Sequence, residues 1–123
     1  MIFPYEYRGY AELSSNGELF ANGQKVDLNA QSAVYTDAQG NIMLPLCALN
    51  EALGLQVKWN QERMSAAIVD DEQTIFDIVL GKDSVTTGNG EEQPLLVQSD
   101  QVNGTAYMSA SDLEQLLHIV FSE

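Results

Sequence analysis

The stretch Pro45-Leu46-Cys47-Ala48-Leu49-Asn50-Glu51-Ala52-Leu53-Gly54-Leu55-Gln56-Val57-Lys58-Trp59 changes from the period of a helix to that of a strand. Leu46, Leu49 and Leu53 recur at the spacing of one helix face. Gly54 is placed to end that helix, and the residues that follow are typical of a strand. The stretch therefore predicts a helix over 45–53 and a strand over 56–59. The helix is too short to be stable alone, so it must lie on a sheet.

A second stretch, over 111–118, repeats the helical pattern. Leu113 and Leu117 stand 64 positions after Leu49 and Leu53, and an Asn-Gly pair at 22–23 has a counterpart 67 positions later. In the second helix, Ser111 and Glu114 have the spacing of a capping box, in which each side chain satisfies a backbone N–H. The matched spacings indicate a weak internal duplication.

Turn signals divide the rest of the chain into short strands. Asn-Gly, which is typical of the tight turns that join antiparallel strands, occurs four times. The predicted strands cover 5–14, 18–21, 24–28, 33–36, 42–44, 56–59, 64–69, 74–80, 84–87, 93–97 and 106–108. We predict an α+β fold, a meandering antiparallel sheet with two short helices packed on it, built from a degenerate internal duplication. A single domain spans 1–123, with an N-terminal arm over 1–18, a first repeat over 19–80 and a second, degenerate repeat over 81–123.

The composition is strongly acidic, with 18 Asp and Glu against 5 Lys and Arg and a formal net charge of −13. Hydrophobic residues make up 45% of the chain, far more than a disordered acidic tail contains. Such a surface lacks the clustered cations that bind nucleic acid or anionic lipid. We also expect no signal peptide in this chain, because no basic region followed by an apolar run opens it, and no membrane span.

Three runs of the first half resemble a known family. They are Asn22-Gly23-Gln24-Lys25-Val26, Ile42-Met43-Leu44-Pro45-Leu46 and Asn50-Glu51-Ala52-Leu53-Gly54-Leu55-Gln56-Val57-Lys58-Trp59-Asn60. They resemble the stalk domain, also called the copper amine oxidase N-terminal domain, which is common in secreted and surface proteins of Gram-positive bacteria. The resemblance implies an α+β module without the copper ligands or quinone cofactor, which belong to a separate catalytic domain. The chain departs from the family pattern at Cys47, where the family usually has Arg, and at Ser109, Ser111 and His118, which replace Pro, Arg and Gly in the second copy.

The chain has one histidine and one cysteine. A catalytic triad or a metal centre needs several such groups together, so we predict that His118 is a surface residue at a helix end. Cys47 stands beside the apolar Leu46, and no second histidine is present to act as a base. We therefore predict a buried or half-buried structural thiol rather than a nucleophile. The chain is predicted to be neither an enzyme nor a cofactor-binding protein.

Two clusters are candidates for an interaction surface. The densest acidic run lies between two predicted strands and indicates a hairpin turn with solvated charges, a weak divalent-cation site being the alternative. Three aromatic residues share one face of the N-terminal arm and either cover the core as an edge strand or contact a partner. The candidate residues are Phe3, Tyr5, Tyr7, Asp70, Asp71 and Glu72. Trp59, at the end of its strand, is predicted to be a core anchor.

These observations favour a non-catalytic extracellular stalk, spacer or protein-interaction module of a bacterial cell-surface or secreted protein. Its partner is an unidentified protein or cell-wall component, and the negative charge favours a basic one. One alternative is a small acidic inhibitor that mimics nucleic acid and occupies a basic groove of an intracellular protein. Another is a carbohydrate-binding accessory domain that uses its tyrosines.

Overall fold

The computed structural model describes residues 9–28, 33–102 and 104–122. Three sheets hold the strands of this part of the chain. Sheet A has the order β13-β1-β2-β3 and consists of β1 (Gly9–Leu13), β2 (Leu19–Ala21), β3 (Gln24–Lys25) and β13 (Ile119–Ser122). Sheet B has the order β11-β12-β5-β4 and consists of β4 (Tyr35–Thr36), β5 (Ile42–Pro45), β11 (Asp100–Val102) and β12 (Thr105–Ser109). Sheet C has the order β10-β9-β8-β7-β6 and consists of β6 (Gln56–Asn60), β7 (Ser65–Asp70), β8 (Gln73–Val79), β9 (Ser84–Thr87) and β10 (Glu92–Pro94).

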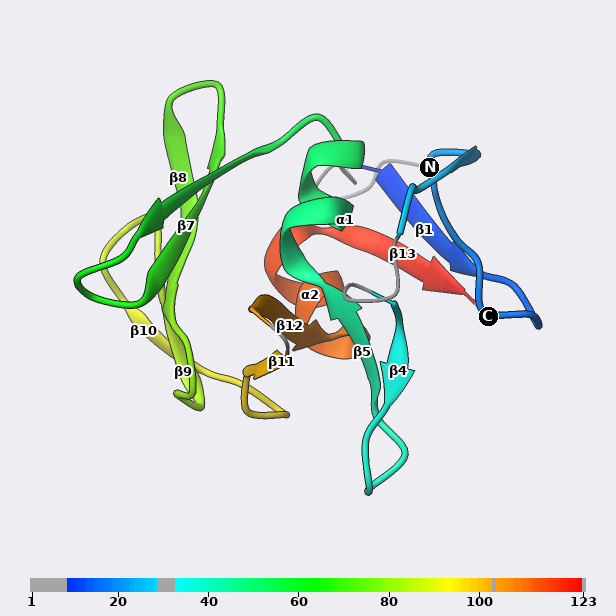
Figure 1. Cartoon of the computed structure of the whole chain (residues 1–123). Coiled ribbons are helices and arrows are strands. Elements are labelled where there is room, and N and C mark those ends of the chain that lie inside the picture. The colour runs from blue at the N-terminus through cyan, green and yellow to red at the C-terminus, as the bar shows by residue number, and fades with distance from the viewer. Residues whose placement is uncertain (1–8, 29–32, 103, 123) are drawn as a thin grey trace, which may run out of the picture.

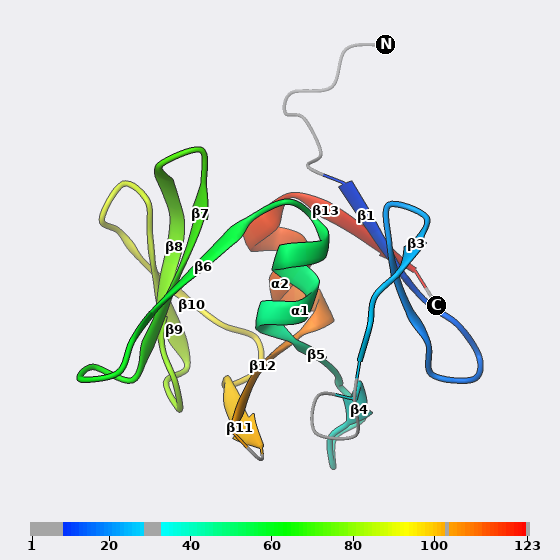
Figure 2. The ribbon, with the colours of Figure 1, turned by 45° about the horizontal axis from the view of Figure 1, so that its top comes forward.

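Two helices fill the space between the sheets. Helix α1 (Leu46–Ala52) contacts β5, β6 and β12, and α2 (Ala110–Leu117) contacts β5, β8, β12 and β13. Figures 1 and 2 show both helices between sheet C and sheet A. Leu49 of α1 and Leu113 of α2 are fully buried and belong to one hydrophobic core with residues of all three sheets. No helix in the described residues is long and apolar enough to cross a membrane.

The α+β prediction is confirmed, but the sheet is not a single meander. The strands separate into three sheets, and β1 pairs with β13 in parallel, with Gly9 opposite Ile119. A parallel neighbour needs a long connection, and here that connection is most of the chain. The hydrophobic pattern within either strand gives no information about a partner so far away in sequence, so the sequence predicted only antiparallel neighbours.

The two halves of sheet B, β4 with β5 and β11 with β12, have the same arrangement. Strands β5 and β12 lie antiparallel at its centre, with Leu44 opposite Met108. Each is paired on its outer side with the strand that precedes it, β4 or β11, and each leads directly into a helix. Each helix is followed by a strand that leaves sheet B, with β6 joining sheet C and β13 joining sheet A.

The predicted capping box of the second helix is wrong by two residues. Helix α2 begins at Ala110, and its N-cap is Ser109, whose hydroxyl accepts a hydrogen bond from the backbone N–H of Asp112 at 3.1 Å. Strand β12 runs into the helix without a loop, so the last strand residue serves as the cap. The first helix ends as predicted, since Gly54 follows the C-cap in the left-handed region with φ of 84°.

Candidate functional site

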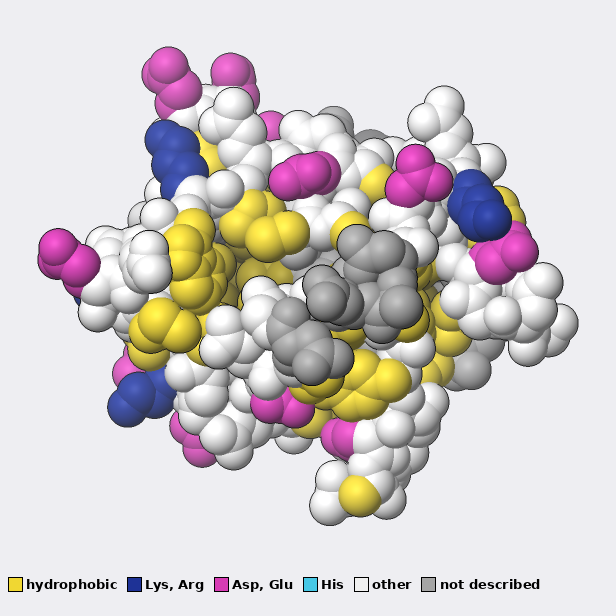
Figure 3. All heavy atoms as spheres, in the orientation of Figure 1, with side chains coloured by type: hydrophobic (Ala, Val, Ile, Leu, Met, Phe, Trp, Pro, Cys, Tyr) yellow, Lys and Arg dark blue, Asp and Glu magenta, His cyan; other side chains and the backbone are white. Residues whose placement is uncertain are grey.

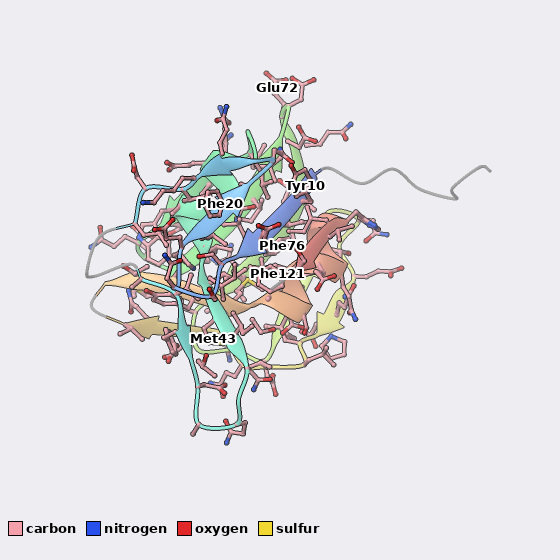
Figure 4. All side chains as sticks on the ribbon, turned by 90° about the vertical axis from the view of Figure 1, so that its right-hand side faces the viewer. Tyr10, Phe20, Met43, Glu72, Phe76 and Phe121 are labelled. Atoms are coloured by element: carbon pink, nitrogen blue, oxygen red, sulfur yellow. The ribbon has the colours of Figure 1, made fainter. Side chains whose placement is uncertain are left out.

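The predicted acidic turn lies at the tip of a hairpin between β7 and β8. Asp71 and Glu72 both have positive φ, as a hairpin turn of type I′ requires, and both are exposed. Figure 4 shows Glu72 at the tip, pointing away from the body of the protein. In the described residues, no group of three or more His, Cys, Asp and Glu is placed to hold a metal ion. The participation of this turn, including Asp70, in an interaction surface stays a prediction.

The aromatic half of the predicted surface lies elsewhere. Phe3, Tyr5 and Tyr7 are outside the described residues, so their role also stays a prediction. The strand expected over 5–14 is represented by β1, which begins at Gly9.

Cys47 is exposed, so of the predicted buried or half-buried structural thiol the buried alternative is wrong. It follows the fully buried Leu46 on α1, and neighbouring residues of a helix do not share a face. The thiol still lies in a partly desolvated place. This desolvation raises its pKa, and the nearby negative charge of Glu51 raises it further. A raised pKa disfavours the thiolate and therefore the nucleophilic role.

His118 lies at the C-cap of α2, as the sequence predicted, and its side chain is exposed. Its backbone is in the left-handed region with φ of 54°. Gly54, which stands 64 positions earlier, also has a positive φ, just after the C-cap of α1.

Trp59 is the sharpest departure from the sequence prediction. It was expected to anchor the core, but 44% of its surface is exposed. The reason is the place of β6, which is an edge strand of sheet C and in which Val57 alone is partly buried. The fully buried Ile68 and Phe76 anchor the inner strands of this sheet instead.

The exposed Trp59 lines an apolar groove of about 420 Å³ between α1, β6 and β12. The lining residues are Pro45, Cys47, Ala48, Glu51, Val57, Trp59, Ala66, Gln101, Gly104, Thr105 and Ala106. We call this the Trp59 groove. Figure 3 shows hydrophobic side chains gathered over the strands of sheet C and beside α1 on this face, with the surface hollowed between them. Among the described residues of the lining, Glu51 alone is charged, and Gln101 and Thr105 are polar, so an occupant would meet mostly apolar surface and a single carboxylate.

A second groove, of about 340 Å³, is lined by equivalent positions of the other helix. Its lining residues are Gly40, Asn41, Ile42, Ser109, Ala110, Ser111, Glu114 and Phe121. Ser109, Ser111 and Phe121 stand 64 positions after Pro45, Cys47 and Val57 of the Trp59 groove. In the opposite direction, residues 40–42 stand 64 positions before 104–106. This second groove is mostly polar, because serines replace the proline and the cysteine.

A wider depression of about 530 Å³ lies beside the β4–β5 hairpin and is lined mostly by polar residues. Several of these already bond to one another. The hydroxyl of Tyr35 donates to a carboxylate oxygen of Asp100 at 3.1 Å, and Asp37 accepts from the backbone N–H of Asn41 at 2.9 Å. Burial, this hydrogen bond and the charge of Asp100 raise the pKa of Tyr35 to about 12. These groups are satisfied within the protein, and the Trp59 groove is therefore the better candidate for binding a partner.

The environment of Cys47 predicts how it reacts. We expect iodoacetamide to modify it completely in the folded protein, because it is exposed, but more slowly at pH 8 than in the urea-unfolded chain. The raised pKa leaves less thiolate at that pH. Glu51→Gln should speed the reaction of the folded protein, because it removes a charge that raises the pKa. Mass spectrometry of the alkylated product over time, at several pH values, measures both rates.

The alkylation experiment has a matched control on the other helix. Gln115→Ser lies on α2, at the position equivalent to Glu51, and should leave the alkylation rate unchanged. A thiol that reacts only when the protein is unfolded would contradict the exposed position of Cys47.

Comparisons with known proteins agree with the family features of the sequence. The family model of the copper amine oxidase N-terminal domain matches residues 20–122. The chain belongs to this family. The N-terminal domain for which the family is named is non-catalytic. The stalk-domain resemblance is thereby confirmed for nearly the whole chain.

A curated relative of this copper amine oxidase N-terminal domain is a protein of Brevibacillus choshinensis named "Protease inhibitor". It is 30% identical over 112 residues, which cover 86% of this chain and 30% of the relative. The chain thus spans less than a third of the length of that protein. No solved structure matches the chain significantly.

Proposed function

We propose that this chain is a non-catalytic interaction module that binds a protein partner in the Trp59 groove. The observation that carries the proposal is the exposure of Trp59 beside α1, in an apolar groove where a core residue was expected. Tryptophan is enriched among the residues that contribute most to protein–protein binding. The raised pKa of Cys47 supports a binding role rather than a nucleophilic one for this groove.

We further propose that the module arose by duplication, with repeats over 19–80 and 81–123 and an arm over 1–18. Two observations support this. Each helix lies between a strand of sheet B and a strand that leaves it, and the two grooves are lined by residues 64 positions apart. In this account one copy of the groove became polar while the other kept an apolar lining and gained a binding role.

We propose an extracellular or cell-envelope location, which the resemblance to stalk domains of secreted and surface proteins supports. There the module would also act as a spacer that holds a neighbouring domain or partner at a distance. It would need no cofactor. The formal charge of −13 would limit self-association and favour a basic partner.

A protease is a specific candidate for the partner. The relative from Brevibacillus choshinensis is named as a protease inhibitor, and the match covers most of this chain. Because the chain covers less than a third of that relative, we propose binding to a protease rather than inhibition by this module alone.

The test uses biosensor binding of the purified chain to four probes: trypsin and subtilisin, each with its active site blocked, a histone, and insoluble peptidoglycan. Our proposal expects binding to a protease that weakens about tenfold or more in Trp59→Ala, since truncating a buried interface tryptophan costs about 1.4 kcal/mol or more. Ser111→Ala in the polar groove is the matched control and should bind as the wild-type chain does.

The other functions give different results in the same experiment. A nucleic-acid mimic would bind the histone, lose affinity steeply with salt and ignore Trp59→Ala. A carbohydrate-binding domain would bind peptidoglycan at high salt and would lose that binding in a Tyr5→Ala, Tyr7→Ala variant. If no probe binds, the interaction role is contradicted and the spacer role alone remains.

A further inference from the structure

We infer that the partner docks as an extended strand on the outer edge of β6 and places apolar side chains in the Trp59 groove. This inference rests on the proposed function and specifies how the same groove is used. It commits to one kind of occupant, an extended peptide segment in which apolar residues alternate with uncharged polar ones and basic residues stand at the two ends.

The edge of β6 is suited to accept a strand. Strand β6 pairs with β7 along its whole length, from Gln56 opposite Val69 to Asn60 opposite Ser65. It ends the order of sheet C, so its other edge pairs with no strand among the described residues. An edge of this kind offers a row of backbone N–H and C=O groups to an incoming chain.

The other sheet edges are less suited to this role. Strands β3 and β4 have two residues each, β10 and β11 have three each, and β13 has four, whereas β6 has five. Strand β10 also ends in Pro94, which lacks the backbone N–H that pairing needs. Short strands and proline are common ways to protect an edge. Among the described edges, β6 is therefore the longest, and it contains no proline.

The groove lies where the side chains of an added strand would fall. Val57 and Trp59, two residues apart on β6, line the groove, and the intervening Lys58 does not. Side chains of a strand alternate between the two faces of a sheet, and residues opposite one another on paired strands are in contact. Alternate residues of a strand added to β6 would therefore lie beside Val57 and Trp59.

The far wall of the groove limits the space for this strand. It is formed by Gly104, Thr105 and Ala106 at the start of β12, and by Cys47 and Ala48 of α1. These side chains are small, so the space beside Trp59 is open to larger apolar side chains from a partner.

The charge of the site indicates where the partner segment carries charged residues. Glu51 is the one charged residue among the described residues of the lining, and its charge adds to desolvation in raising the pKa of the Cys47 thiol, one turn earlier on α1. The chain as a whole carries a formal charge of −13. Basic residues at the ends of the segment would therefore be attracted to this site, and acidic residues would be repelled. The residues between the apolar ones would lie on the face of Lys58, where a basic side chain would be repelled, so they are uncharged.

The chain itself provides two probes of this site. Trp59 is the single tryptophan of the sequence, and Cys47 is the single cysteine. Both line the groove. An occupant should therefore shift the fluorescence emission of the protein to shorter wavelengths and slow the alkylation of its one thiol, with no engineered label.

The experiment uses blocked heptapeptides of sequence Lys-Val-Ser-Leu-Ser-Val-Lys. Two further versions carry three backbone N-methyl groups each, one on the three apolar residues and the other on the two serines and the C-terminal lysine. In an extended strand these two sets of N–H groups point to opposite edges, because the backbone groups of successive residues alternate in direction. Only one set can face β6. Calorimetric titration of the whole chain measures the affinity of each peptide, and the fluorescence of Trp59 reports groove occupancy.

Strand addition predicts that the parent peptide binds, that one N-methylated version loses at least tenfold in affinity and that the other binds as the parent does. Trp59→Ala should weaken the parent at least tenfold, and Ser111→Ala should not. A peptide with serine in place of the three apolar residues should bind at least tenfold more weakly. This comparison separates docking in the groove from attraction between opposite charges.

The opposing results distinguish this inference from the proposed function. If both N-methylated versions bind as the parent does and Trp59→Ala still weakens them, the groove binds a partner but not by strand addition. If the parent peptide does not bind at all, strand addition is overturned, while the protein-binding measurements on whole proteases still decide the proposed function. If Trp59→Ala has no effect on any ligand, both are wrong.

Discussion

Replacing Asp112 with alanine is expected to lower the free energy of unfolding by about 3–4 kcal/mol, since a buried carboxylate with several partners is lost. Only 2% of Asp112 is exposed. Its carboxylate accepts hydrogen bonds from the backbone N–H groups of Leu96 and Val97, at 2.8 and 3.0 Å, and from the Ser109 hydroxyl at 2.8 Å. The substitution leaves two backbone N–H groups without this acceptor.

The Asp112→Ala prediction is tested by urea denaturation followed by circular dichroism. Asp112→Asn keeps one carbonyl oxygen and should lose less than Asp112→Ala, while Ser111→Ala, on the exposed side of the same helical turn, should stay within about 0.5 kcal/mol of the wild-type chain. A loss below about 1 kcal/mol for Asp112→Ala would mean that the carboxylate does not hold residues 96–97 to α2.

The second large effect is expected in sheet C, which carries the edge strand β6. Phe76 of β8 is fully buried and lies opposite Ile68 of β7, and Figure 4 shows where it lies. Phe76→Ala should lower the free energy of unfolding by about 3–5 kcal/mol, the cost of removing a buried ring and leaving a cavity. Denaturation monitored by the fluorescence of Trp59 measures this loss from within the same sheet.

Two comparisons make the Phe76 result specific. Phe76→Leu should cost much less than Phe76→Ala, because it fills most of the cavity with apolar atoms. Trp59→Ala should cost less than Phe76→Ala as well, because Trp59 is 44% exposed. If Trp59→Ala were the more destabilising of the two, Trp59 would be a core anchor. The proposal that the Trp59 groove binds a partner would then lose its main support.

The local features of the fold could be predicted from the sequence. The leucine spacing identified both helices, and the charged run over 70–72 identified the β7–β8 turn, because these features depend on residues close together in the chain. The start of α2 was missed for a local reason as well. Ser109 and Ser111 are both residues that suit an N-cap, and the two hydrogen bonds between Ser109 and Asp112 make Ser109 the cap.

The candidate site could not be predicted because it depends on tertiary structure. Trp59 is a large apolar residue of the kind that usually lies in a core. Its exposure follows from the position of β6 at a sheet edge. Cys47 lies beside a buried leucine in sequence but on another face of α1. One signal was present, however. The spacing of 64 residues that aligned the two helices also aligns Cys47 and Val57 of the one groove with Ser111 and Phe121 of the other.

Of the two grooves, which are lined by equivalent positions, we expect only the one beside Trp59 to receive a partner. Nuclear magnetic resonance of the ¹⁵N-labelled chain, titrated with the parent heptapeptide, tests this expectation residue by residue. We predict that the largest shifts fall on the backbone amides of Val57, Lys58 and Trp59 and on Cys47 and Ala48 of α1, with Ser111 and Phe121 unchanged. Equal shifts at both grooves, or shifts centred on the acidic turn at Asp71 and Glu72, would contradict it.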